Sequence, residues 1–199
     1  MIKFNLTLLL FVVNVIAAGQ TAVPVKEQKF ISTVKAVVTA FSRQDSAAVS
    51  KYIKPGTGLY QLYRNGVFDN YVHQDTISFT DPGFPNVQYA SSAGILYTTL
   101  QYAKLPTYNC ETMKWSKRGV YADTAKTSHI LSKICKDRNQ YVPDNIPQSD
   151  INKYYSLENK SRRIVVFDRN HKELVFYLSW INNRWYLTIV DFVTSDCSA

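Results

Sequence analysis

Residues 174–191 have the sequence LVFYLSWINNRWYLTIVD, and this stretch decides the fold. Large apolar side chains occupy every second position on either side of the Asn182-Asn183 pair, which is the pattern of strands with one buried face. A two-residue turn at this pair places Trp180 opposite Trp185. In the same register, Leu178 lies opposite Leu187, so apolar side chains face each other along one face of the hairpin. The sequence therefore predicts an antiparallel hairpin whose register is set by the turn.

Continued along the strands, this register places Phe176 opposite Ile189 and Leu174 opposite Asp191. Asp191 then lies on the apolar face. A carboxyl group buried there would have a raised pKa and could act as a general base. The alternative is that the strand ends here and Asp191 lies at a solvated rim. Asp191 is the first candidate catalytic residue.

Further strands and helices extend from this hairpin. Residues 164–167 predict a third strand of the same meander. An apolar stripe of helical period predicts a helix over 26–42, and Asp45 is expected to cap a second helix from Ser46. Residues 59–64 and 67–73 flank Asn65-Gly66, a strong signal for another hairpin.

The middle of the chain gives weaker signals. Residues 91–103 favour a helix over a strand, and residues 104–122 read as irregular. A helix is expected from Asp123 or Thr124 to about Lys136, followed by a polar loop over 137–161 that could contain a short helical turn. Without a repeat or linker, residues 20–199 are expected to form one domain.

Helices first and an antiparallel meander last predict an α+β fold in which helices pack on a curved sheet. The chain resembles the NTF2-like superfamily in three elements: the helix over 26–42, the second helix capped by Asp45, and the closing strand that contains Trp185. It is also similar to secreted proteins of the Bacteroidetes type. The resemblance implies a cone of curved sheet. It also implies that an acid–base enzyme of the isomerase or dehydratase type could use the cone as its pocket, with Asp191, and His73 as a second candidate, taking part.

The N-terminus has the features of a secretory signal peptide. Lys3 precedes an apolar run over residues 6–16, and the small residues Ala17-Ala18-Gly19 follow. Cleavage is expected after Gly19 or after Ala18. The alternative is a membrane anchor, but the run is about half the roughly 20 residues that a spanning helix needs. We therefore expect a secreted or periplasmic protein with no membrane span after cleavage.

Three cysteines in an exported chain predict one disulfide and one remaining thiol. Cys110 and Cys135 bracket one segment and are the favoured pair. Cys197 could instead tie down the C-terminal tail, and three free thiols are the remaining alternative. The scattered histidines do not form a metal-ligand pattern, so neither a metal nor a cofactor is expected.

Two further groups of side chains are candidate sites. His73 and Asp75 could form a proton-shuttling pair, the alternative being a surface loop. Aromatic residues gather around the 59–73 hairpin and could stack on a sugar or contact a partner protein, the alternative being packing within a sheet. The candidate binding residues are Tyr60, Tyr63, Arg64, Tyr71, Trp180 and Trp185.

The formal net charge of +8 is concentrated between Lys114 and Arg138. Export argues against nucleic acid as the partner, and a solvated surface or attraction to anionic envelope material is the expected role of these charges. The sequence favours noncatalytic binding of a small ligand, glycan or partner protein. The alternatives are the NTF2-like enzyme and an envelope structural or inhibitory protein.

Overall fold

The computed structural model describes residues 23–81, 83, 89–123, 129–142 and 144–198. The predicted signal peptide over 1–19 lies outside this range. The described residues form a mixed α+β fold with four α-helices, a seven-stranded sheet and a small two-stranded sheet.

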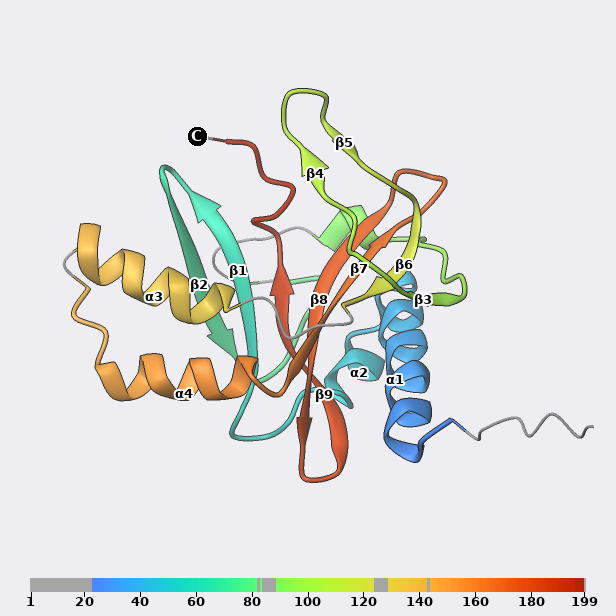
Figure 1. Ribbon diagram of the computed structural model, residues 1–199, viewed down its shortest axis with the longest axis horizontal. Coiled ribbons are helices and arrows are strands. Elements are labelled where there is room, and N and C mark those ends of the chain that lie inside the picture. The colour runs from blue at the N-terminus through green and yellow to red at the C-terminus, as the bar shows by residue number, and fades with distance from the viewer. Residues whose placement is uncertain (1–22, 82, 84–88, 124–128, 143, 199) are drawn as a thin grey trace, which may run out of the picture.

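The large sheet has the strand order β2-β1-β9-β8-β7-β6-β3 (Figure 1). Its neighbours are antiparallel except for the pairs β1–β9 and β3–β6, which are parallel. The predicted meander is confirmed as β7-β8-β9. The strands are β1 Leu59–Asn65, β2 Phe68–Gln74, β3 Leu100–Tyr102, β6 Gly119–Ala122, β7 Ser161–Phe167, β8 Glu173–Ile181 and β9 Arg184–Asp191, and the small sheet pairs β4 Tyr108–Asn109 with β5 Lys114–Trp115.

One face of the sheet, here called the first face, is covered by α1 (Val25–Ser42) and α2 (Ser46–Ser50). The apolar stripe of α1 is buried as predicted, with the Phe30 ring centroid 4.9 Å from that of Trp185. Asp45 caps α2 by accepting a hydrogen bond from the Ala48 N–H at 2.9 Å. Both expectations for the start of the chain are therefore confirmed.

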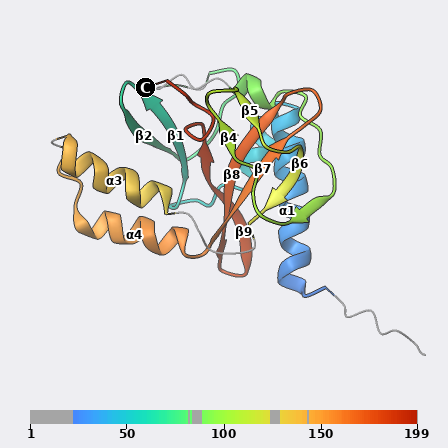
Figure 2. The ribbon, with the colours of Figure 1, turned by 45° about the horizontal axis from the view of Figure 1, so that its top comes forward.

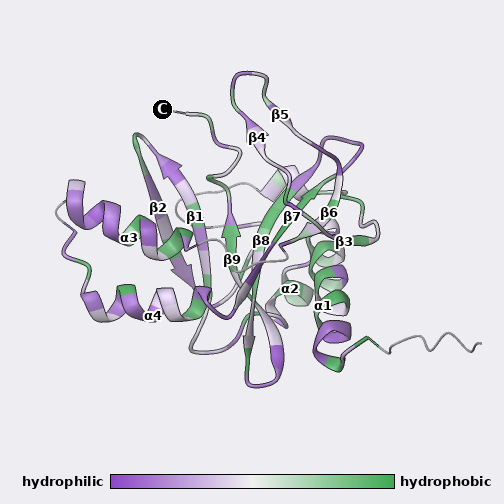
Figure 3. Cartoon of the chain, in the orientation of Figure 1, coloured by the Kyte–Doolittle hydropathy of each residue, from purple (hydrophilic) through white to green (hydrophobic). Residues whose placement is uncertain are grey.

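On the opposite, second face two helices inserted between β6 and β7, α3 (Ile130–Tyr141) and α4 (Gln148–Glu158), pack against β1, β8 and β9 (Figure 2). The β4–β5 hairpin covers the β7–β8 part of this face through Trp115. Glu158 joins the two helices, since its carboxylate accepts hydrogen bonds from the backbone N–H groups of Leu131 and Ser132 at the start of α3. The stretch 137–161, expected to be a polar loop, instead contains the end of α3 and the whole of α4. Hydrophobic residues follow the central strands of the sheet (Figure 3), where they form core clusters on both faces.

A β-bulge corrects the predicted register of the C-terminal hairpin. Leu178 pairs with Leu187 as predicted, but Tyr177 then pairs with Ile189, so Thr188 is an extra residue in β9. Beyond the bulge every β9 side chain is on the face opposite to the one predicted. Asp191 therefore lies on the second face. Because helices cover both faces, β9 can place apolar residues on either side, and alternation alone could not locate the bulge.

The other hairpin and the middle of the chain also differ in detail. Asn65 pairs with Phe68, so the central turn residues are Gly66 and Val67 and not Asn65-Gly66. Gly66 has φ +78°, which suits the first central position of a type II′ turn. Residues 91–103 contain the end of a short 3₁₀ helix, η1 (Tyr89–Ser92), and strand β3 in place of the expected helix.

The disulfide joins Cys110 to Cys197, with the Cα atoms 5.6 Å apart, so the favoured Cys110–Cys135 pairing is wrong. Cys135 is a free, buried residue on the inner side of α3. The C-terminal tail after β9 returns past the β4–β5 hairpin and brings Cys197 to Cys110. This approach depends on the path of the tail and not on sequence spacing. A disulfide is consistent with an oxidising compartment.

Candidate functional site

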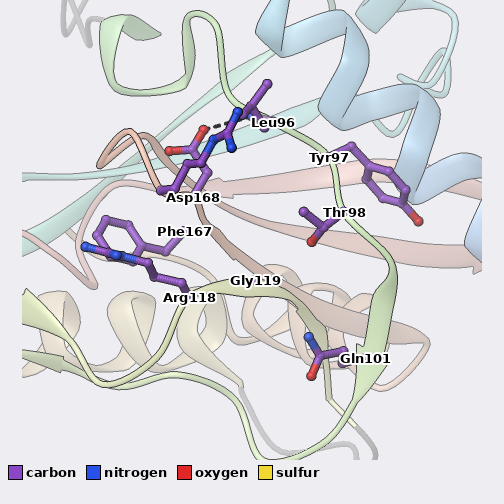
Figure 4. A pocket seen from close by; sticks show the side chains of 9 residues that line it. Leu96, Tyr97, Thr98, Gln101, Arg118, Gly119, Phe167 and Asp168 are labelled. Carbon is purple, nitrogen blue, oxygen red and sulfur yellow. Dashed lines mark hydrogen bonds between the residues drawn. The ribbon is translucent and has the colours of Figure 1, made fainter.

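A pocket of about 500 Å³ lies at the end of the sheet where β7 turns into β8 (Figure 4). The segment before β3, the start of β6 and the β7–β8 turn form its walls, and we call it the rim pocket. Such volumes are typical of small-ligand sites, which span about 300–1,000 Å³. Its lining residues are Leu96, Tyr97, Thr98, Gln101, Arg118, Gly119, Phe167, Asp168 and Arg169.

Asp168 holds two walls of the rim pocket together. Its Oδ1 accepts hydrogen bonds from the backbone N–H groups of Asn170 and Lys172, at 2.7 and 3.0 Å. Its Oδ2 accepts one from the Leu96 N–H at 2.9 Å. The residue is buried, and these bonds stabilise the β7–β8 turn and tie it to the segment before β3. Its carboxylate therefore positions the walls.

Two exposed arginines flank the same pocket. The Arg118 guanidinium lies over the Phe167 ring, 6.0 Å from its centroid, and Arg169 follows Asp168 in the turn. Neither arginine is within ion-pair distance of a carboxylate among the described residues. Both retain their donors for a ligand, and a guanidinium can bind a carboxylate through two parallel hydrogen bonds.

The opposite wall supplies uncharged polar groups and a close backbone approach. Thr98 and Gln101 line the pocket across from Phe167 (Figure 4). Gly119 has φ +138°, and a Cβ atom there would lie 2.9 Å from the Tyr121 ring. A side chain at this position would therefore displace its neighbours, so glycine keeps the β6 backbone at the pocket wall.

Asp191 lies outside the rim pocket, and its carboxylate is fully hydrogen-bonded. Its Oδ1 accepts from the N–H groups of Val193 and Thr194, both at 3.0 Å. Its Oδ2 accepts from the Thr194 hydroxyl at 2.7 Å and forms an ion pair with Arg163 at 3.1 Å. The side chain has no exposed area. The group therefore anchors the C-terminal tail to the sheet.

His73 is exposed on β2, and its Nε2 lies 2.9 Å from the Thr57 carbonyl oxygen. Its ring packs against that of Tyr60, with 4.7 Å between centroids. The described residues show no hydrogen bond between His73 and Asp75, so the structure does not bring the predicted pair together.

The predicted aromatic binding residues are divided between packing and surface. Tyr60 is only 4% exposed and lies under α4, with its ring 5.2 Å from that of Tyr154. Burial raises the pKa of Tyr60, and Tyr71, which also contacts Tyr154, has its pKa raised by the same cause. Arg64 pairs with Asp69 at 2.7 Å. Tyr60 and Tyr71 thus attach α4 to the hairpin.

The two tryptophans and Tyr63 also differ in how far they are exposed. Trp185 is buried and donates from Nε1 to the Lys26 carbonyl at 3.1 Å. Trp180 is half-buried, with the Lys26 ammonium 4.9 Å from its ring centroid, and Tyr63 is half-buried on β1. Tyr63, Tyr71 and Trp180 are the predicted aromatic residues that retain some exposed surface.

The rim-pocket residues were missed by the sequence reasoning because they come from three separate segments. Arg118 and Gly119 fall in a stretch read as irregular, and Arg169 falls in a turn next to Asp168. Each segment alone resembles an ordinary loop. No local sequence signal marks the site.

The chain matches no family model, no curated protein and no solved structure. Within the described residues no helix is long and apolar enough to cross a membrane. The same residues contain no group of three or more histidine, cysteine or acidic side chains arranged to hold a metal ion.

Proposed function

We propose that the protein is exported and binds a small carboxylate-bearing ligand in the rim pocket without transforming it. One observation carries the proposal: Arg118 and Arg169 flank a 500 Å³ pocket and have no carboxylate partner among the described residues. The Asp168 carboxylate beside them is engaged with three backbone N–H groups.

The lining favours an acidic sugar as the ligand class. Leu96, which is 38% exposed, offers apolar surface to a sugar ring, and the small exposed part of Phe167 adds to it. Thr98 and Gln101 can hydrogen-bond to hydroxyl groups. A carboxylate on the sugar would then pair with a guanidinium. Acidic sugars are also compatible with an exported location, which the Cys110–Cys197 disulfide supports.

Binding is proposed in preference to catalysis because the acidic groups already have structural partners. Asp168 stabilises the pocket walls, and Asp191 is buried elsewhere beneath the C-terminal tail. A general base needs an available lone pair directed at the substrate. The NTF2-like assignment, the signal peptide and the acid–base enzyme associated with that superfamily stay predictions.

The test is calorimetric titration with glucuronate, with glucose as the uncharged comparison. We expect glucuronate to bind and glucose not to bind. Arg118→Gln or Arg169→Gln should each raise the Kd for glucuronate about 10-fold to 100-fold, since a hydrogen bond to a charged group contributes about 1.5–3 kcal/mol. Arg43→Gln, an exposed arginine outside the pocket, is the matched control. Equal binding of glucose, or unchanged Kd values in both pocket variants, would contradict the proposal.

A further inference from the structure

Exposed cations surround the β8–β9 turn, at the end of the molecule opposite the rim pocket. They come from α1, from the residue that follows α2, from the α4–β7 connection and from β9. We call this group the basic end. Its members are Lys26, Lys29, Lys51, Lys160 and Arg184.

Direct contacts bring these separate segments together at the turn. The Lys29 ammonium lies 3.4 Å from the Asn183 carbonyl oxygen, which joins α1 to the turn. Arg184 donates from Nη2 to the Lys51 carbonyl at 3.0 Å, which joins the turn to the end of α2. The positive charges therefore belong to one surface, although their positions in the sequence are far apart.

Trp180 connects the remaining two lysines to this surface. The Lys26 ammonium lies 4.9 Å from the Trp180 ring centroid, and the backbone N–H of Trp180 donates to the backbone carbonyl of Lys160 at 2.9 Å. Glu27 is the neighbouring carboxylate, and it binds Arg162 at 2.7 and 2.9 Å. None of the five cations forms an ion pair within the part of the chain that the structure describes.

Apolar side chains border the basic end where α1 begins. Val23 and Val25 are 48% and 66% exposed. Trp180 is half-buried beside Lys26, and tryptophan is favoured where a membrane meets water. This end thus combines positive charge, exposed apolar groups and an interfacial aromatic residue.

We propose that the basic end binds the surface of a membrane containing anionic phospholipids. The β8–β9 turn projects from the sheet (Figure 1). The cations come from segments that contact this turn, and such a spread suits an extended anionic surface better than a single small anion. In this orientation the Asn182-Asn183 turn faces the headgroups. The nine residues of β8 separate that turn from the β7–β8 turn by about 30 Å, so the rim pocket faces away from the membrane.

This proposal is independent of the ligand proposed for the rim pocket, and vesicle flotation of the full exported protein tests it. Phosphatidylcholine vesicles are compared with vesicles of phosphatidylcholine and phosphatidylglycerol. The test variant changes Lys29, Lys51 and Lys160 to Gln. The matched control changes three exposed lysines elsewhere, Lys104, Lys114 and Lys136, to Gln. Both triple variants remove the same net charge.

We expect the unaltered protein to partition preferentially onto the anionic vesicles. The basic-end variant should lose about 100-fold in its partition coefficient, since each basic residue near an anionic surface contributes roughly fivefold. The single variants Lys29→Gln and Lys51→Gln should each lose about fivefold, which guards against a folding defect in the triple variant. The control variant should lose about twofold or less, because its lysines lie away from the surface, where screening weakens their effect.

Three results would overturn the proposal. Equal losses in the two triple variants would show that net charge alone drives binding. Equal partitioning onto both vesicle types would show that the anionic headgroups are not recognised. Displacement of the bound protein by soluble glycerol phosphate would show a site for a small phosphate and not for a membrane surface.

Discussion

Replacement of Asp191 by alanine is expected to destabilise the protein strongly, because the side chain connects β9, the C-terminal tail and Arg163. Its carboxylate accepts two backbone N–H bonds and one hydroxyl bond, and it pairs with a guanidinium. The Asp191 side chain has no exposed area and that of Arg163 is 18% exposed. The variant therefore leaves a nearly buried cation without its partner.

The expected loss in the free energy of unfolding is about 3–5 kcal/mol, the usual cost of removing one member of a buried ion pair. Asp191→Asn retains an acceptor for the backbone N–H groups and should lose about 2 kcal/mol, close to the contribution of a hydrogen bond to a charged group. The double variant Arg163→Met with Asp191→Ala should be more stable than Asp191→Ala alone, because no unpaired guanidinium remains.

Equilibrium unfolding in urea, with the disulfide intact, measures these losses. With a slope of about 2 kcal/mol per molar, a loss of 4 kcal/mol lowers the midpoint by about 2 M. Asp137→Ala is the control, since the Asp137–Lys133 pair is solvent-exposed and should contribute about 0.5 kcal/mol or less. If Asp191→Ala costs no more than this control, or raises stability, the structural role assigned to Asp191 is refuted and a functional charge becomes the better explanation.

Two other predictions concern the cysteines and acid stability. Cys197→Ser should lower the free energy of unfolding by about 4–5 kcal/mol, measured in urea under oxidising conditions, because the disulfide closes a loop of 87 residues. Cys110→Ser should lower it by the same amount, because it removes the same disulfide. Cys135, whose pKa burial raises to about 11, should resist alkylation at neutral pH until the protein unfolds; rapid labelling of the native protein would contradict its burial. Burial opposes ionisation of Glu27, but hydrogen bonds from Arg162 and Tyr102 outweigh it and hold its pKa below 4.5. The resulting stabilisation is present above pH 4.5 and is lost as the pH falls through the folded-state pKa of Glu27. The Glu27→Gln variant should therefore lose less stability on acidification than the unaltered protein. Parallel plots of unfolding free energy against pH for the two proteins would refute this.

The sequence alone determined the elements whose signals are local. The apolar stripe of α1, the Asp45 cap and the Asn182-Asn183 turn each depend on residues within a few positions of one another. Side-chain periodicity and turn chemistry therefore predicted the helix, the cap and the Trp180–Trp185 pairing. They also predicted the hairpin near Gly66, though its turn lies one residue further along.

Tertiary structure alone decided the features that depend on distant contacts. The bulge at Thr188 turned Asp191 to the second face of the sheet. Apolar β9 side chains such as Ile189 can also lie on that face, because α3 and α4 cover it. The path of the tail, not the spacing of cysteines, paired Cys110 with Cys197. The rim pocket and the basic end each gather side chains from several segments. Their charges meet only after the chain has folded, because short-range sequence patterns carry no information about which loops will lie side by side.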